Sequence, residues 1–405
     1  MNQLASLMPI DEPQPIGASR VSFIERSAFF GLGFRPFYLL AAVFAVLSVP
    51  VWLLAFLGHL GSLPNVTLLW HMHEMVLGFA VAVVVGFLFT AARNWTGLWT
   101  PRGRTLALIA AVWLAGRAAM LLAPPAIAAG VDLLFLPVAI VPLLNVMLRS
   151  GKRSNLPLLA LLVLLFLTNL SFHASVLGWS TLSPMKAIEV AILVLAVLST
   201  VMGGRVIPGF TKNMAPGSAP RSDARVDRAG VGLLIAASLA WTLDWPGALS
   251  ATLALAAGLL QWLRLAYWTP AQTRAYPLLW ILHLAFAWIG LGFLLLGAAQ
   301  LGYASVSTAM HAIAIGGMSS LILGMMSRTT LGHTGHRMRA ERHEWLIFGA
   351  VQCAAIFRIL ANVLDRDARG IFLTISAIFW VIAFATFIAM FGALLCRPRM
   401  DGREG

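Results

Sequence analysis

Residues 276–299 read YPLLWILHLAFAWIGLGFLLLGAA, an apolar run in which His283 is the one ionisable side chain apart from the terminal tyrosine. About 20 apolar residues in a helix are enough to cross the roughly 30 Å hydrocarbon core of a bilayer. The run is typical of the chain, which has 405 residues, 60% of them hydrophobic and 11% charged. Soluble domains carry roughly 25% charged residues. The composition therefore excludes a water-soluble globule and predicts an all-α, polytopic membrane protein.

Similar apolar runs recur along the chain and predict a bundle of about twelve transmembrane helices. The expected spans are 37–58, 66–92, 104–123, 127–148, 157–178, 184–207, 229–243, 246–268, 276–299, 304–327, 342–364 and 370–396. The span 229–243 is the weakest, because it is short and only Asp244 and a Trp-Pro-Gly turn separate it from the next one. We expect residues 1–35 to form a disordered cytoplasmic tail, 36–396 the transmembrane domain and 397–405 a short cytoplasmic tail.

The basic residues alternate along the chain. Lysine and arginine gather before the first span and in every second connection, whereas the other connections are nearly free of them. Short cytoplasmic loops hold the positive charge of membrane proteins, so both termini are expected in the cytoplasm. The net charge of +13 is then a topology signal. It does not indicate a nucleic-acid partner, which would require a basic face on a folded soluble domain.

Five histidines fall inside the expected spans: His71, His73, His173, His283 and His311. Ionisable groups within hydrocarbon are rare and mark functional sites, and neutral imidazole is the commonest metal ligand. A single buried histidine is as well explained by a hydrogen bond to a neighbouring helix. The group as a whole predicts a metal or haem site. Four of the five lie toward the outer half of their spans, whereas His283 lies at a different depth.

The densest cluster is WHMHEM, residues 70–75, near the start of the second span. Residues three apart share a helix face, so we expect His71 and Glu74 to face one way and His73 the other. One helix would then serve two sites, or one site and a hydrogen-bond network. Glu74 is the candidate for proton delivery, because it is a carboxyl group within the expected span. Met72 and Met75 are noted because a thioether beside imidazole suits Cu(I).

The same spacing of glycines follows two of the histidines, and we call this similarity the echo. Glycines follow His73 at +5 and +13 and a Thr-Gly pair at +23, and the same offsets recur after His311. Duplicated membrane folds place their sites at the interface between repeats. The echo predicts an internal parallel repeat in which His73 and His311 are equivalent and oppose each other as ligands of one centre. Chance remains an alternative in a chain with 35 glycines.

Arginines accompany glycine and tryptophan at the expected cytoplasmic ends of the helices. Topology and snorkelling account for each of them alone, but a cofactor with carboxylates also needs arginine, which pairs them bidentately. The candidates for binding haem propionates are Arg35, Arg93, Arg205 and Arg328, with His333 in the loop that follows.

Seven motifs, in this order and spacing, resemble the NnrS family, which are haem- and copper-containing bacterial membrane proteins tied to nitric oxide metabolism. They are GFRPFYLLAA (33–42), WHMHEM (70–75), GFLFTAARNWTG (86–97), GGRVIP (203–208), PLLWILHLAFAW (277–288), AMHAIAIGGM (309–318) and MSRTTLGHTG (326–335). The resemblance implies a twelve-helix protein of the bacterial inner membrane with haem b, copper and a role in the nitric oxide response. It does not say which histidine binds which metal.

Three functions remain open from the sequence. The first is reduction of nitric oxide with electrons from quinol or a periplasmic carrier. The second is sensing, scavenging or metal handling without turnover, which the absence of a recognisable electron-transfer motif favours slightly. The third is secondary transport, since twelve spans also fit that class. For the first two we expect haem iron held by His73 and His311, with His71, His173 or His283 near a second metal. The oligomeric state is not indicated.

Overall fold

The computed structural model describes residue 24 and residues 27–61, 63–151, 153–364 and 366–402. Most of the expected tail 1–35 and the last residues of 397–405 lie outside this part of the chain. The described elements are all helices: η1 (Ala28–Phe30), α2 (Phe34–Phe56), α3 (Leu68–His73), η2 (Glu74–Ala80), α4 (Val81–Thr96), α5 (Gly103–Leu122), α6 (Pro125–Asp132), α7 (Phe135–Arg149), η3 (Arg153–Asn155), α8 (Leu156–Val176), α9 (Pro184–Met214), α10 (Ala224–Thr242), α11 (Gly247–Tyr267), η4 (Pro270–Thr273), α12 (Pro277–Gln300), α13 (Val306–His311), η5 (Ala312–Ser319), α14 (Ser320–His333), α15 (Arg342–Val363) and α16 (Arg366–Cys396).

The all-helical fold predicted from the sequence is confirmed. Each of the twelve expected spans coincides, within a few residues at most ends, with a helix or a run of consecutive helices. In the described part of the chain, eleven of these are long and apolar enough to cross a membrane. The twelfth is α10, which forms over the weakest expected span. It carries Arg225, Asp227 and Arg228 in its first turns, and these charges explain its lower hydropathy.

Local sequence signals set the beginnings of the helices. Thr67 and Ser305 are the N-caps of α3 and α13, and each side chain accepts a hydrogen bond from the backbone N–H three residues on. Such caps satisfy N–H groups that the first turn leaves unpaired. Proline lies at the first helical position of α9 and α12, where its missing N–H is not needed.

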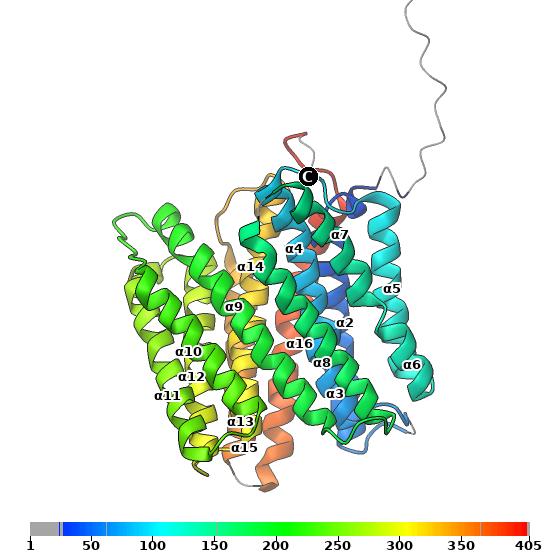
Figure 1. Ribbon diagram of the computed structural model, residues 1–405. Coiled ribbons are helices and arrows are strands. Elements are labelled where there is room, and N and C mark those ends of the chain that lie inside the picture. The colour runs from blue at the N-terminus through cyan, green and yellow to red at the C-terminus, as the bar shows by residue number, and fades with distance from the viewer. Residues whose placement is uncertain (1–23, 25–26, 62, 152, 365, 403–405) are drawn as a thin grey trace, which may run out of the picture.

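The helices run in one general direction as a bundle (Figure 1). Helices α10, α11 and α12 form one side of it, and α5 and α6 lie at the opposite side. The C-terminus lies at the same end as the C-terminal part of α4, whereas α3 and α13 lie toward the far end. We call that end, which holds both α3 and α13, the distal end.

The helices that follow α3 and α13 begin in the same unusual way. Directly after His73 and directly after His311 the backbone changes from α-helix to π-helix, over η2 and η5. Within η2 the pattern is explicit, since the N–H of Val81 bonds the carbonyl of Val76, five residues back. Turns of π-helix occur mostly at functional sites. The shared backbone change agrees with the echo in the sequence, and the repeat itself stays a prediction.

A reciprocal glycine contact holds α11 against α12. A Cβ on Gly258 would lie 2.7 Å from the carbonyl oxygen of Gly290, and one on Gly290 would lie 3.1 Å from that of Gly258. Small residues allow such close approach between membrane helices. We expect Gly258→Val to destabilise the protein by about 1–3 kcal/mol through overpacking.

The measurement is thermal unfolding of the purified protein in detergent. Gly232→Val in α10 is the matched control, because a Cβ there meets nothing within 4 Å. Equal melting temperatures for the two variants would contradict the contact.

Candidate cofactor cavity and buried polar network

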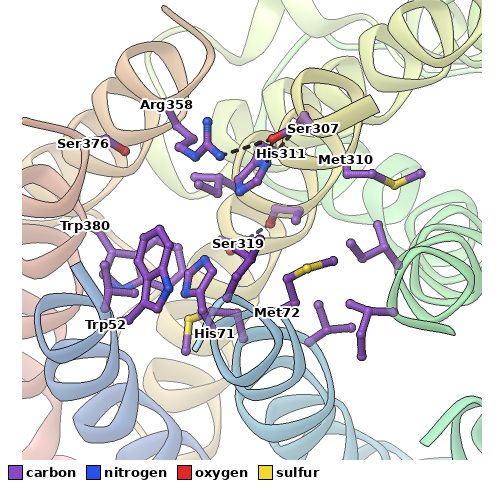
Figure 2. A pocket seen from close by; sticks show the side chains of 18 of the residues that line it. Trp52, His71, Met72, Ser307, Met310, His311, Ser319, Arg358, Ser376 and Trp380 are labelled. Atoms are coloured by element: carbon purple, nitrogen blue, oxygen red, sulfur yellow. Dashed lines mark hydrogen bonds between the residues drawn. The ribbon is translucent and has the colours of Figure 1, made fainter. Parts of the chain in front are cut away.

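A cavity of about 460 Å³ lies between helices at the distal end. Cofactor pockets typically measure about 300–1,000 Å³ and are apolar with a few placed polar groups. This one fits that description, since side chains from α2, α3, η2, α9, α13, η5, α15 and α16 line it and most of them are apolar. The polar lining residues are His71, Glu189, Ser307, His311, Ser319, Arg358, Arg369 and Ser376. Figure 2 shows how His71 and His311 enter the cavity from two different helices.

His311 is oriented by its own helix. Its Nδ1 lies 2.7 Å from the carbonyl oxygen of Ser307, one turn earlier, and therefore donates its hydrogen there. The neutral ring then carries a bare Nε2, to which no described residue is hydrogen-bonded. Histidines that ligate metals almost always donate the other ring nitrogen to a carbonyl or carboxylate in this way. His311 is thus prepared as a ligand toward the cavity.

His71 reaches the same cavity from α3. Its ring stacks on Trp52 of α2, with ring centroids 3.8 Å apart and planes 18° from parallel. Its Nδ1 is buried and has no hydrogen-bond partner among the described residues. A buried polar nitrogen without a partner is unfavourable. A ligand that bound this nitrogen would remove that cost.

Two arginines line the cavity. Arg358 of α15 hydrogen-bonds Asn362 at 2.9 Å and the Ser307 hydroxyl at 3.3 Å, which holds it beside His311 (Figure 2). Arg369 of α16 also lines the cavity and is exposed. No described carboxylate forms an ion pair with Arg358. The guanidinium group of Arg358 therefore offers a positive charge to the cavity, as a ligand with carboxylates requires.

The rest of the wall is rich in sulfur. Five methionines line it: Met72, Met75, Met185, Met310 and Met318. Their thioethers keep water out and are soft donors that suit Cu(I) beside imidazole. One carboxyl group, that of Glu189, lines the cavity, and its Oε2 accepts a 3.0 Å hydrogen bond from Trp241.

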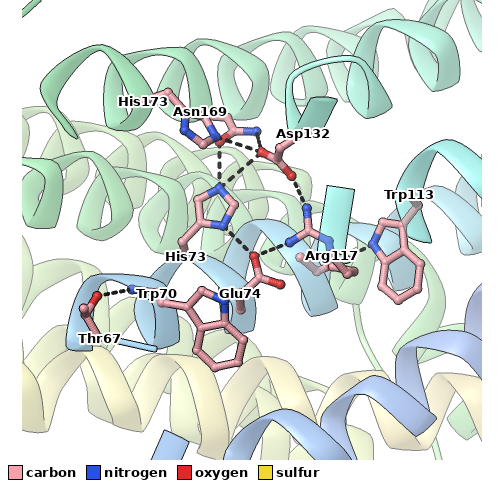
Figure 3. A network of polar contacts seen from close by, with 10 residues as sticks. Thr67, Trp70, His73, Glu74, Trp113, Arg117, Asp132, Asn169 and His173 are labelled. Atoms are coloured by element: carbon pink, nitrogen blue, oxygen red, sulfur yellow. Dashed lines mark hydrogen bonds and ion pairs between the residues drawn. The ribbon is translucent and has the colours of Figure 1, made fainter. Parts of the chain in front are cut away.

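A second cluster of polar side chains lies on the other face of α3 and does not line the cavity. Arg117 of α5 pairs with both Glu74 and Asp132, which ends α6 (Figure 3). His73 lies 2.9 Å from Glu74 and 2.9 Å from the amide oxygen of Asn169 in α8. We call Glu74, His73, Arg117, Asp132, Asn169 and His173 the polar network.

The network is balanced in charge and almost wholly hydrogen-bonded. Asp132 accepts from Asn169 at 2.7 Å and from His173 at 3.0 Å. Both ring nitrogens of His73 face oxygen acceptors, which only the protonated ring can satisfy by donating twice. Two cations, Arg117 and His73, then offset two carboxylates. Such balance is what allows four charges to be buried within hydrocarbon.

Three members of the network also have the spacing of a metal site. One ligand atom each of His73, Asp132 and His173 lies within 4.8 Å of the other two. However, a doubly donating His73 has no lone pair for a metal, and Arg117 already holds one oxygen of Asp132. The spacing would admit an ion, but the hydrogen bonds favour the network as a structural tie between α3, α5, α6 and α8.

Two geometric expectations from the sequence are wrong. Glu74 does not share a face with His71, because it pairs with His73 and Arg117 instead. The reason is the partners that Glu74 finds in His73 and Arg117, because its backbone N–H still bonds the carbonyl of Trp70, four residues back, as in an α-helix. Nor does the structure bring His73 and His311 together, since His311 lines a cavity with His71 and His73 lies in the network. The helix carries a cavity-lining histidine and a hydrogen-bond network, which is the second of the two arrangements expected for it.

The expected propionate arginines all have other surroundings. Arg35 bonds the carbonyls of Leu394, Leu395 and Arg397 at the end of α16, and Arg93 bonds that of Gly97. Arg205 bonds Asn155, and Arg328 bonds the carbonyl of Leu278. None of the four lines the cavity, which Arg358 and Arg369 line instead.

The two remaining predicted residues also lie elsewhere. His283 bonds the carbonyl of Leu279 and lies 3.2 Å from the Thr211 hydroxyl, so both its nitrogens have partners. His333 packs against the ring of Phe34 with centroids 5.5 Å apart. Their present geometry is that of packing residues.

Sequence reasoning missed the residues that complete both sites. Arg117 and Arg358 are noticeable as charges in apolar runs, and Asp132 interrupts one as well. Asn169 and Ser307 gave no signal at all. No pattern within one helix indicates which charge on another helix is its partner.

Together these features define a class: a polytopic, all-helical membrane protein that encloses a cavity lined by histidine and methionine. The family model described as NnrS protein matches residues 28–399, nearly the whole chain, and the chain belongs to the NnrS family. A comparison with curated proteins finds no match.

Proposed function

We propose that the cavity holds haem b and that the protein binds nitric oxide there, as part of nitric oxide detoxification or response in the bacterial inner membrane. One observation carries the proposal: His311, with Nδ1 tied to the Ser307 carbonyl, presents Nε2 to a cavity of cofactor size. Membership in the NnrS family supports it. Haem would supply an iron that binds a small neutral gas and changes oxidation state.

The chain's own residues have separate tasks in this proposal. His311 and His71 are the candidate iron ligands, and Trp52 keeps the His71 ring in its plane by stacking. Arg358, held by Asn362 and Ser307, would bind the carboxylates of the cofactor. The methionine wall excludes water. If bound gas is reduced, Glu189 is the carboxyl group that lines the cavity, and it replaces Glu74 as the candidate for holding a proton.

The basic connections favour an orientation in which the distal end, and with it the cavity, lies on the outer side of the membrane. A neutral diatomic gas dissolves in lipid and needs no polar channel to reach it. A site on that side could receive electrons either from quinol in the bilayer or from a carrier on the outer side. The structure bears on neither donor, so the donor stays a prediction.

Absorption spectroscopy of the purified, detergent-solubilised protein tests the proposal. We expect a Soret band that shifts when nitric oxide is added to the reduced protein. Amperometry then separates the two functions within this frame: continued consumption with a reductant present indicates a reductase, whereas uptake that stops near one equivalent per haem indicates binding only. Protein that lacks a Soret band, when prepared from haem-replete cells, would refute haem binding.

Copper is the second candidate occupant, and the five cavity methionines favour it. Two imidazoles and several thioethers form a donor set that suits Cu(I). Metal analysis of the same sample decides: copper at one equivalent without a Soret band would support this candidate over haem.

A further inference from the structure

A second, smaller cavity adjoins the first. It measures about 70 Å³ and is lined from α2, η2, α4, α9, η5 and α14. Tyr38 and Ser199 are its only polar lining residues among those described. A dry apolar cavity of this kind accepts small apolar atoms and gases. Its volume excludes anything much larger.

The two cavities share a wall of two residues. Ala80 and Met318 line both of them. Ala80 ends η2 and Met318 lies within η5, so the two π-helices form the partition. Both residues are nearly fully buried, at 2% and 4% exposure. Met318 has a flexible, unbranched side chain that changes rotamer readily.

Part of the lining of the small cavity is not fully buried. Val84, Phe87, Leu321, Ile322 and Met325 line it and are half-buried on the surface of spanning helices. Acyl chains rather than water surround such side chains at this depth. Through the shared residues Ala80 and Met318, this surface of α4 and α14 adjoins the cavity of His71 and His311.

We propose that small uncharged gas molecules reach the histidine cavity from the bilayer through this second cavity, with Met318 as the constriction between the two. The inference rests on the proposed function for its destination. It adds a route, a resting site for gas and a residue that sets the rate of arrival.

Carbon monoxide recombination after flash photolysis of the reduced protein in nanodiscs measures this rate directly, without turnover. We expect Met318→Phe to slow bimolecular association by about fivefold or more, equivalent to a barrier about 1 kcal/mol higher. Met318→Ala should accelerate it. Met326→Ala is the matched control, because Met326 is buried on α14 and lines neither cavity.

Unchanged rates in both Met318 variants, with Soret and carbon monoxide spectra like those of the wild type, would overturn the route and leave haem binding intact. Xenon tests the cavity independently of haem. We expect ¹²⁹Xe NMR to show binding that Met318→Phe weakens and Met326→Ala does not. If xenon does not bind the wild-type protein, the resting site is refuted even if the haem site is correct.

Discussion

Replacing His311 with alanine is expected to remove most of the haem from the purified protein. Even the loss of a supporting partner of a ligating histidine lowers metal affinity by about 10–100-fold, and loss of the ligand itself should do no less. His71→Ala should lower haem content too, and the double variant should show no Soret band. If both rings bind one iron, each single variant changes the spectrum from low spin to high spin.

Two histidine controls make this result specific. His283→Ala and His333→Ala remove imidazoles that do not line the cavity and should keep a normal Soret band. Exogenous imidazole added to His311→Gly should restore part of the band, because a free ring can fill the vacated position. A normal band in the double variant of His71 and His311 would show that the haem is bound elsewhere or that another occupant fills the cavity.

Arg117→Ala should be the most destabilising substitution in the chain. It removes the one side chain that pairs with both Glu74 and Asp132, and leaves two buried carboxylates with only His73 to offset them. Breaking a buried ion pair by removing one partner costs about 3–5 kcal/mol. We expect loss of folded protein, measured as the monodisperse fraction on size exclusion and as the melting temperature in detergent.

Charge balance, rather than volume, is the reason we give, and a compensating substitution tests it. Combining Arg117→Gln with Asp132→Asn removes one charge of each sign and should recover part of the folded protein that Arg117→Gln alone loses. Arg104→Ala removes an arginine from an exposed position of the same helix, outside the polar network, and should destabilise the protein much less than Arg117→Ala. If Arg117→Ala folds like the wild type, the polar network is not what ties α3 to α5 and α6.

The architecture could be read almost completely from the sequence. Hydropathy alone located all twelve helices, because within hydrocarbon an apolar run must form a helix to satisfy its backbone hydrogen bonds. It also identified the weakest span, since α10, which forms over 229–243, is not among the eleven described helices that are long and apolar enough to cross a membrane. Motif order indicated the family.

The candidate site could be read only in part. The sequence indicated that His71 and His73 serve different places on one helix, and this is correct. It paired His73 with His311 from the spacing of the glycines that follow them, and it assigned Glu74 to the face of His71 from the helix period. Neither signal indicates which residues of other helices lie nearby. The partners Arg117 and Asp132, which lie on α5 and α6, are what these inferences lacked.

The sequence by itself therefore determined that the protein lies in a membrane, where its helices are, and which residue types are available for chemistry. These properties depend on composition and on spacing within one segment. The tertiary structure alone decided which residues meet: His71 with His311 and Arg358 around a cavity, and His73 with Arg117 and Asp132 in a balanced network. The physical reason is that partners in a membrane bundle lie on different helices. Their pairing depends on how each helix is rotated and how closely it packs, and no periodicity within a single helix records that.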